Sequence, residues 1–230
     1  MTDFNDIGIS QKLDWPRIAH LFRVGLFGTV LTFIGDMLLG WDVGDETLTG
    51  LSRMFSAYTD ISDFGIFLAA ILGLFGIAIE GLCYFGIYRL MAEHAPKYAH
   101  RYRADIFGYM IFGPCGFHVP VCAAVFLMKY GFAEALVLKY VLYFVLPAFA
   151  LFWVSFAVLE ITQIQAFAKG LTPYPKWCWV FSLPVGMAAA VLLNVFGNQP
   201  WVNAISCAWI SVGNLWMFGG LLTAMRRIEK

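Results

Sequence analysis

Five polar side chains stand inside long apolar stretches of this 230-residue sequence: Asp36, Glu80, His118, Glu160 and Asn214. An ionisable group in an apolar interior is costly, so such residues are typical of ligand sites and proton pathways. A buried carboxyl group without a charged partner keeps its proton and can then act as a proton carrier or a general acid. We therefore treat these five residues as candidates for binding a ligand or a proton.

The composition identifies the environment that surrounds them. The chain is 60% hydrophobic and 13% charged, with a mean hydropathy of +0.73, whereas a water-soluble domain carries about 25% charged residues. Its formal net charge is zero, and no basic run interleaved with aromatic residues indicates a nucleic-acid partner. The sequence predicts an all-α, polytopic integral membrane protein whose main partner is the lipid bilayer.

Six segments are long enough to cross a bilayer, given that a spanning helix needs about 20 apolar residues. Residues 1–21 precede them as a polar and aromatic interfacial segment, in which Asp14, Trp15 and Pro16 indicate a helix start. Residues 22–230 then form one six-helix transmembrane domain, with no signal peptide before it. The predicted spans are 22–41, 64–88, 105–128, 139–163, 178–196 and 203–225.

The basic residues predict the orientation. Twelve of the fifteen Lys and Arg residues lie in the N-terminal segment, the 89–103 and 169–176 loops and the C-terminal segment. Only Arg53, Lys129 and Lys139 fall on the opposite side. Cytoplasmic loops carry an excess of positive charge, so both termini are expected in the cytoplasm, with the plasma membrane as the location.

Helical spacing indicates where the candidate residues point. Ala69, Gly73 and Gly76 share a stripe with Glu80, and small residues mark faces where membrane helices pack closely. Comparable small-residue stripes run beside Asp36, beside Asn214, and along Gly108, Cys115, His118 and Cys122.

The depth of each group follows from its separation from the basic residue nearest the predicted cytoplasmic end. Asp36, His118 and Asn214 are expected at one level. Glu80 and Glu160 are expected roughly 6 Å nearer the cytoplasm.

Two prolines flank His118 in the third predicted span. Pro114 and Pro120 each remove a backbone hydrogen bond, so we expect an irregular helix there. Freed carbonyl groups beside a histidine suit a ligand or water site. The alternative is that the two prolines only shape the packing.

Each candidate also has a simpler interpretation. Asp36 is close enough to Trp41 and Asp42 to reach water at the outer face, and Glu160 could lie at the cytoplasmic interface. A lone histidine is often a hydrogen-bonded core residue. Glu80 is the hardest to explain in this way.

The remaining features predict no cofactor and no metal site. Five cysteines lie in or beside apolar segments without C-x-x-C spacing, which favours buried core residues over disulfides or zinc. Residues 42–63 form an acidic loop whose apolar residues have near-helical spacing, so an amphipathic surface helix or a lid is expected there. The deeper aromatic residues either pack the core or line a pocket: Trp153, Trp209, Trp216, Tyr84, Tyr109 and Tyr143.

Two short segments resemble known membrane enzymes. Ile34–Trp41 resembles the Gly-Asp-x-Leu-Leu segment of the lysoplasmalogenase-like family, which implies hydrolysis of vinyl-ether lipids by membrane aspartates. That family has a second aspartate where the nearest counterpart here is Asn214. Ile79–Gly81, with Asn214 and Trp216 downstream, is similar to the emopamil-binding sterol isomerase family, which implies acid–base catalysis in a membrane pocket. Segments this short do not assign the chain to either family.

Three functions fit the sequence. The first is a carrier or binding protein for a lipophilic or small organic solute, whose buried acids handle protons. The second is an intramembrane enzyme with acid–base chemistry on a lipid-like substrate, and the third is a structural membrane subunit. The sequence contains no catalytic signature such as a nucleophile elbow or a His-Glu-x-x-His motif, so the carrier is preferred. It predicts neither the ligand nor the oligomeric state.

Overall fold

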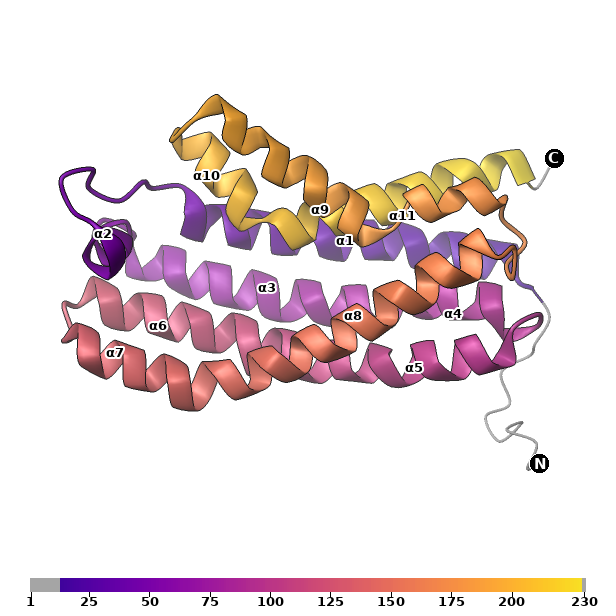
Figure 1. The fold of residues 1–230 in the computed structure, drawn as a ribbon, viewed down its shortest axis with the longest axis horizontal. Helices are drawn as coiled ribbons and strands as arrows, with labels where there is room; N and C mark the ends of the chain where they lie inside the picture. The colour runs from indigo at the N-terminus through magenta and orange to yellow at the C-terminus, as the bar shows by residue number, and fades with distance from the viewer. Residues whose placement is uncertain (1–12, 229–230) are drawn as a thin grey trace.

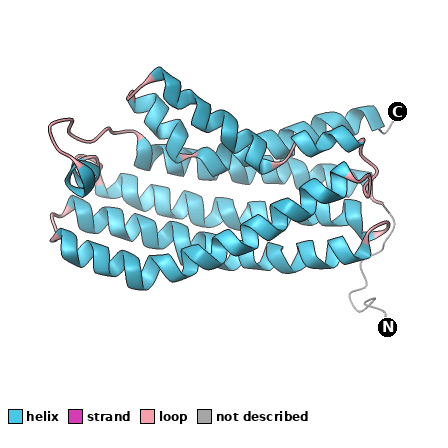
Figure 2. Cartoon of the chain, viewed as in Figure 1, coloured by secondary structure: helices cyan, strands magenta, loops and turns pink. Residues whose placement is uncertain are grey.

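A computed structural model describes residues 13–228, and residues 1–12 and 229–230 lie outside the described part. The described residues form helices joined by loops and turns and contain no strand (Figure 2). The α-helices are α1 Trp15–Gly40, α2 Gly50–Ser56, α3 Asp63–Cys83, α4 Phe85–Ala92, α5 Pro96–Ile111, α6 Val119–Lys129, α7 Glu134–Tyr140, α8 Leu146–Ala168, α9 Leu183–Leu192, α10 Pro200–Cys207 and α11 Trp209–Ile228. Two π-helical segments, Phe112–His118 and Val141–Val145, and two 3₁₀ turns, Lys176–Val180 and Leu193–Phe196, connect some of them.

Several helices are long and apolar enough to cross a membrane, which suggests an integral membrane protein. Four helices meet this criterion of length and composition: Trp15–Gly40, Asp63–Ala92, Pro96–Lys129 and Glu134–Ala168. A fifth forms only if α10 and α11, bent by 66° at their junction, count as one span. The expected span over 178–196 is instead the shorter apolar helix Leu183–Phe196, because residues 176–180 form a separate 3₁₀ turn. The count of six therefore stays a prediction.

The bundle has two distinct ends (Figure 1). The beginning of α1 and the end of α11 lie at the same end, next to the turn between α4 and α5. α2 and the turn between α6 and α7 lie at the opposite end. The segments rich in Lys and Arg thus gather at the first end. Which end faces the cytoplasm is still a prediction.

The start of α1 confirms the helix signal at residues 14–16. The Asp14 carboxylate accepts a hydrogen bond from the backbone N–H of Arg17 at 3.0 Å, which satisfies one of the donors that every helix start leaves free. Pro16 occupies the first turn, where its missing N–H costs nothing. Residues 15–21 of the predicted interfacial segment therefore belong to α1, and residues 1–12 lie outside the described part.

Small residues bring α1 and α3 into close contact, as the predicted stripes require. A Cβ atom added to Gly76 would lie 2.7 Å from the carbonyl oxygen of Gly28, and one added to Gly35 would lie 3.0 Å from that of Ala69. Only residues without a bulky side chain permit this approach. The two stripes therefore pack on each other and place Asp36 and Glu80 at the same helix interface.

The predicted amphipathic helix in residues 42–63 is present as α2. Leu51 and Met54 of α2 are exposed, whereas Phe55 packs against the core formed by Ala124, Met128 and Val137. One side of α2 therefore rests on α6 and the other carries exposed apolar residues. Its position at a membrane surface stays a prediction.

Candidate functional site

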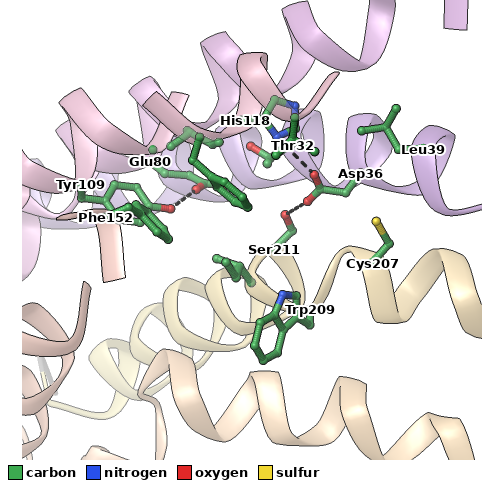
Figure 3. Close-up of a pocket in the computed structure, with 15 residues that line it drawn as sticks. Thr32, Asp36, Leu39, Glu80, Tyr109, His118, Phe152, Cys207, Trp209 and Ser211 are labelled. Atoms are coloured by element: carbon green, nitrogen blue, oxygen red, sulfur yellow. Dashed lines mark hydrogen bonds and ion pairs between the residues drawn. The ribbon is translucent and has the colours of Figure 1, made fainter. Parts of the chain in front are cut away.

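A cavity of about 110 Å³ lies inside the bundle. Three of the five candidate residues, Asp36, Glu80 and His118, line it (Figure 3). The walls are otherwise mainly apolar and aromatic. They comprise Thr32, Leu39, Ile77, Tyr109, Gly113, Phe117, Val121, Phe152, Cys207, Trp209, Ile210 and Ser211.

The π-helical segment Phe112–His118 positions the histidine. It contains Pro114, and Pro120 lies in the first turn of α6, so the regular backbone bonding is disturbed where the sequence predicted. π-Helical turns inside α-helices are frequent at functional sites. The wider turn also changes which residues share a face, and for this reason Cys115 is exposed instead of lying beside His118 as the α-helical stripe predicted.

Gly73 makes room for the imidazole ring. A Cβ atom at position 73 would lie 1.9 Å from Nε2 of His118, so any larger residue would displace the ring. The Nε2 atom lies 3.1 Å from the carbonyl oxygen of Ala69. A carbonyl oxygen only accepts hydrogen bonds, so Nε2 carries a proton and Nδ1 is the atom that faces Asp36.

Asp36 lies beside His118. Nδ1 of His118 lies 3.6 Å from Oδ1 of Asp36, and the Ser211 hydroxyl donates to Oδ2 of Asp36 at 2.8 Å. The Asp36 carboxyl group therefore has a basic ring and a hydroxyl donor beside it within an apolar surrounding.

Glu80 is held by neutral donors. The Tyr109 hydroxyl donates to Oε2 at 2.8 Å and the Asn214 amide donates to the same oxygen at 2.9 Å. Tyr84 in turn donates to Oδ1 of Asn214 at 2.6 Å. Tyr109 and Asn214 direct donors to Oε2 of Glu80 and Tyr84 orients Asn214, so the network fixes the carboxyl group in one orientation.

The second carboxyl oxygen of Glu80 differs from the first in its hydrogen bonding. Its Oε1 atom is buried and has no hydrogen-bond partner in the described part of the chain. The nearby hydroxyls of Thr29 and Thr32 donate to carbonyl oxygens of their own helix, at Gly25 and Gly28. Glu80 itself is only 1% exposed, so solvent does not satisfy this oxygen.

A second broken helix borders the cavity. The 66° bend between α10 and α11 falls at Ala208, between the cavity-lining residues Cys207 and Trp209. Ser211 follows in the first turn of α11 and bonds to Asp36. In Figure 3, α11 brings Trp209 and Ser211 to the cavity from the side opposite His118.

The other two candidate residues lie outside the cavity wall. Asn214 was expected at the depth of Asp36 and His118, but it bonds to Glu80 and Tyr84 and so lies at the level of Glu80. Glu160 is buried in a separate place, where its Oε2 accepts from the backbone N–H of Leu183 at 3.2 Å. That bond caps the beginning of α9. Glu160 is therefore neither at an exposed interface nor in the cavity.

Some cavity residues were not predicted from the sequence, or were predicted only as members of a larger group. Ser211 carried no signal, because no proline or glycine marks the bend at Ala208 that aims it at Asp36. Tyr109 and Trp209 were grouped with deep aromatic residues and do line the cavity. Tyr143 was placed in the same group but is 73% exposed, and it lies in the π-helical segment Val141–Val145.

The arrangement can hold a small molecule and exchange a proton with it. Asp36 and His118 provide an acid and a base, Glu80 provides a carboxyl group with one oxygen that lacks a partner, and the aromatic walls can receive an apolar group. Among the described residues, no group of three His, Cys, Asp or Glu side chains is placed to hold a metal ion.

Comparisons with other proteins define the family but not the activity. Neither the curated proteins nor the solved structures gave a match. One family model matches residues 4–227, which is nearly the whole chain. The chain therefore belongs to DUF6796, a family of unknown function.

Proposed function

We propose that this chain is a multi-pass integral membrane protein that binds a small organic solute in its cavity and exchanges a proton with it, in the manner of a carrier. The cavity supplies the two requirements of such a site. Aromatic and aliphatic walls receive the apolar part of the solute, and Asp36, His118 and Glu80 receive its polar part.

The observation that carries the proposal is the position of the cavity at two discontinuous helices. The π-helical segment ends at His118 on one wall, and the α10–α11 bend lies beside Asp36 on another. Discontinuous helices of this kind form the substrate and ion sites of secondary transporters, because irregular backbone is tolerated in a membrane only beside a cavity or protein. Helix breaks are also where segments can move relative to each other.

The proposal includes six spans with both termini in the cytoplasm. In a variant without native cysteines, single cysteines at Thr47 and Lys97 would lie on opposite sides. A membrane-impermeant thiol reagent added to intact cells should label the Thr47→Cys variant and spare the Lys97→Cys variant until the membrane is opened. Labelling of both from outside would contradict this arrangement.

Native mass spectrometry of the protein in nanodiscs tests the site itself. We expect the wild type to retain a small molecule that Asp36→Asn and His118→Gln lose. Glu160→Gln is the matched control, because it alters a buried acid that does not line the cavity, and it should retain the molecule. If all four proteins carry the same molecules or none, the polar cluster only joins helices and the proposal fails.

An intramembrane acid–base enzyme is the second candidate. Asp36, His118, Glu80 and Tyr109 all line one cavity instead of being spread along the bundle, which is the arrangement that a general acid and a general base need. Incubating the molecule retained by the wild type with fresh protein distinguishes the two functions. Conversion to a product that Glu80→Gln cannot form would favour the enzyme, and unchanged release would favour the carrier.

A further inference from the structure

We infer that the solute is a small organic cation, an ammonium compound, and that it displaces the proton of Glu80 when it binds. This inference rests on the proposed function and names its substrate class. It is carried by the unsatisfied oxygen of Glu80, the balance of charges around the cavity and the character of the walls.

The first step concerns hydrogen bonding. Oε1 of Glu80 is buried and has no hydrogen-bond partner, whereas among the described residues Tyr109 and Asn214 donate to Oε2. In the neutral carboxyl group the proton therefore lies on Oε1. Once that proton leaves, Oε1 becomes a buried acceptor without a donor, which costs free energy. A ligand that brings its own N–H donors into the cavity would complete the hydrogen bonding of Glu80. An ammonium group consists of such donors and accepts none.

The second step concerns charge. The titratable groups on the cavity wall are Asp36 from α1, Glu80 from α3, Tyr109 from α5, His118 from the π-helical segment and Cys207 from α10. No Lys or Arg is among the lining residues. The imidazole of His118 faces Asp36, so among the lining residues Glu80 is the acid without a basic partner. A carboxylate buried alone is very costly, which means that Glu80 holds a proton until a cation replaces it.

The third step concerns the walls. Phe117, Phe152 and Trp209 line the same cavity as Glu80, and aromatic faces attract organic cations through their negative ring quadrupole. The volume of about 110 Å³ is smaller than the roughly 150 Å³ of a cavity that accepts benzene. It therefore suits a compact ammonium group with a short alkyl chain. An anionic solute would instead face two carboxyl groups.

The exchange balances without any further reactant. The ammonium group enters with its positive charge, the O–H bond of Glu80 breaks, and the proton leaves to water. The resulting carboxylate accepts a hydrogen bond from the ammonium group, so the net charge of the cavity stays unchanged. Binding should release one proton, and affinity should rise with pH until Glu80 is ionised in the empty protein.

Isothermal titration calorimetry on the full chain in zwitterionic nanodiscs tests this inference. The probes are n-butylammonium, n-butanol and butyrate, which share one alkyl chain, and empty nanodiscs give the background. Titrations in two buffers of different ionisation enthalpy count the protons. We expect n-butylammonium to bind with release of about one proton and the other two probes to bind more weakly.

Two variants complete the test. Glu80→Gln should weaken n-butylammonium binding by about tenfold to a hundredfold, the scale of one hydrogen bond to a charged group, and abolish the proton release. Glu160→Gln should bind as the wild type does, and the unfolding temperature of each variant verifies its fold. Equal binding of n-butanol or butyrate, lost in Asp36→Asn, would overturn the substrate class and leave the proposed function standing. Proton uptake on binding, or no binding of any probe, would also overturn the inference.

Discussion

Two glutamates of this protein are equally deeply buried but lie in different parts of the bundle. Glu80 and Glu160 are 1% and 2% exposed, each accepts hydrogen bonds on Oε2, and each has an Oε1 atom without a partner. Only Glu80 lines the cavity. A buried acid is thus not a site by itself, and the space beside it decides whether its proton can be exchanged for a ligand.

The neighbours of the two residues explain the difference. Glu160 accepts the Leu183 N–H, and the adjacent Gln163 accepts from Tyr102 and donates to the carbonyl oxygen of Phe181. This second group, Glu160, Gln163 and Tyr102, fastens the segment before α9 to α8 and α5. The partners of Glu80, by contrast, are side chains that fix its orientation at the edge of an open space. We therefore expect mutations in the second group to change stability and those around the cavity to change ligand binding.

The largest contrast should come from the glycines that support the two regions. Gly73→Ala would place a methyl group 1.9 Å from Nε2 of His118, and Gly213→Ala would place one 2.7 Å from the carbonyl oxygen of Leu183. Each should lower the free energy of unfolding by about 1–3 kcal/mol, the usual cost of overpacking. In the folded fraction of each variant, the small molecule should be lost from Gly73→Ala and retained by Gly213→Ala.

Denaturant titration in mixed micelles and native mass spectrometry together measure this contrast. Gly219→Ala is the control, since its added Cβ atom would meet only Leu26 at an ordinary 3.9 Å. Loss of the retained molecule in Gly213→Ala, measured on folded protein, would mean that the two regions are coupled.

Removing the carboxyl group of Glu160 should have the next largest effect. Glu160→Ala leaves the buried N–H of Leu183 without an acceptor, which costs about 1–3 kcal/mol. Glu160→Gln keeps an acceptor oxygen and should restore most of that loss. Thermal unfolding of the two variants measures the difference. If Glu160→Gln were as unstable as Glu160→Ala, the charge of Glu160 and not its cap on α9 would be the stabilising feature.

Much of the fold follows from the sequence because apolar length and small-residue spacing are local properties. The helix start at Asp14, the small-residue faces on α1 and α3 and the irregular helix around His118 were all predicted from neighbouring residues. The bend at Ala208 was not, since no proline or glycine marks it. The separation of Glu160 from the cavity was also missed, because it depends on Leu183, which follows a connection that the sequence assigned to a continuous span.

The pairing of the site residues shows the same limit. Asp36 and His118 were placed at one depth by counting residues from the helix ends, and they are in contact. Counting also placed Asn214 with them, but Asn214 bonds to Glu80 instead, because a count along one helix does not fix how far neighbouring helices are shifted along each other. Depth along one helix is thus predictable, whereas the partner across helices is not.

The smallest expected effect comes from removing one tyrosine hydroxyl beside the cavity and one beside Gln163, and it compares the two regions most directly. Tyr109→Phe removes the donor to Glu80, and Tyr102→Phe removes the donor to Gln163. The chemical deletion is the same, so each variant should lose about 0.5–1.5 kcal/mol of stability. In calorimetry with n-butylammonium, however, only Tyr109→Phe should change the affinity or the number of protons released, because only Tyr109 holds the carboxyl group that exchanges its proton. An equal change of affinity in both variants would show that ligand binding follows overall stability. The polar residues around the cavity would then have no specific role in binding.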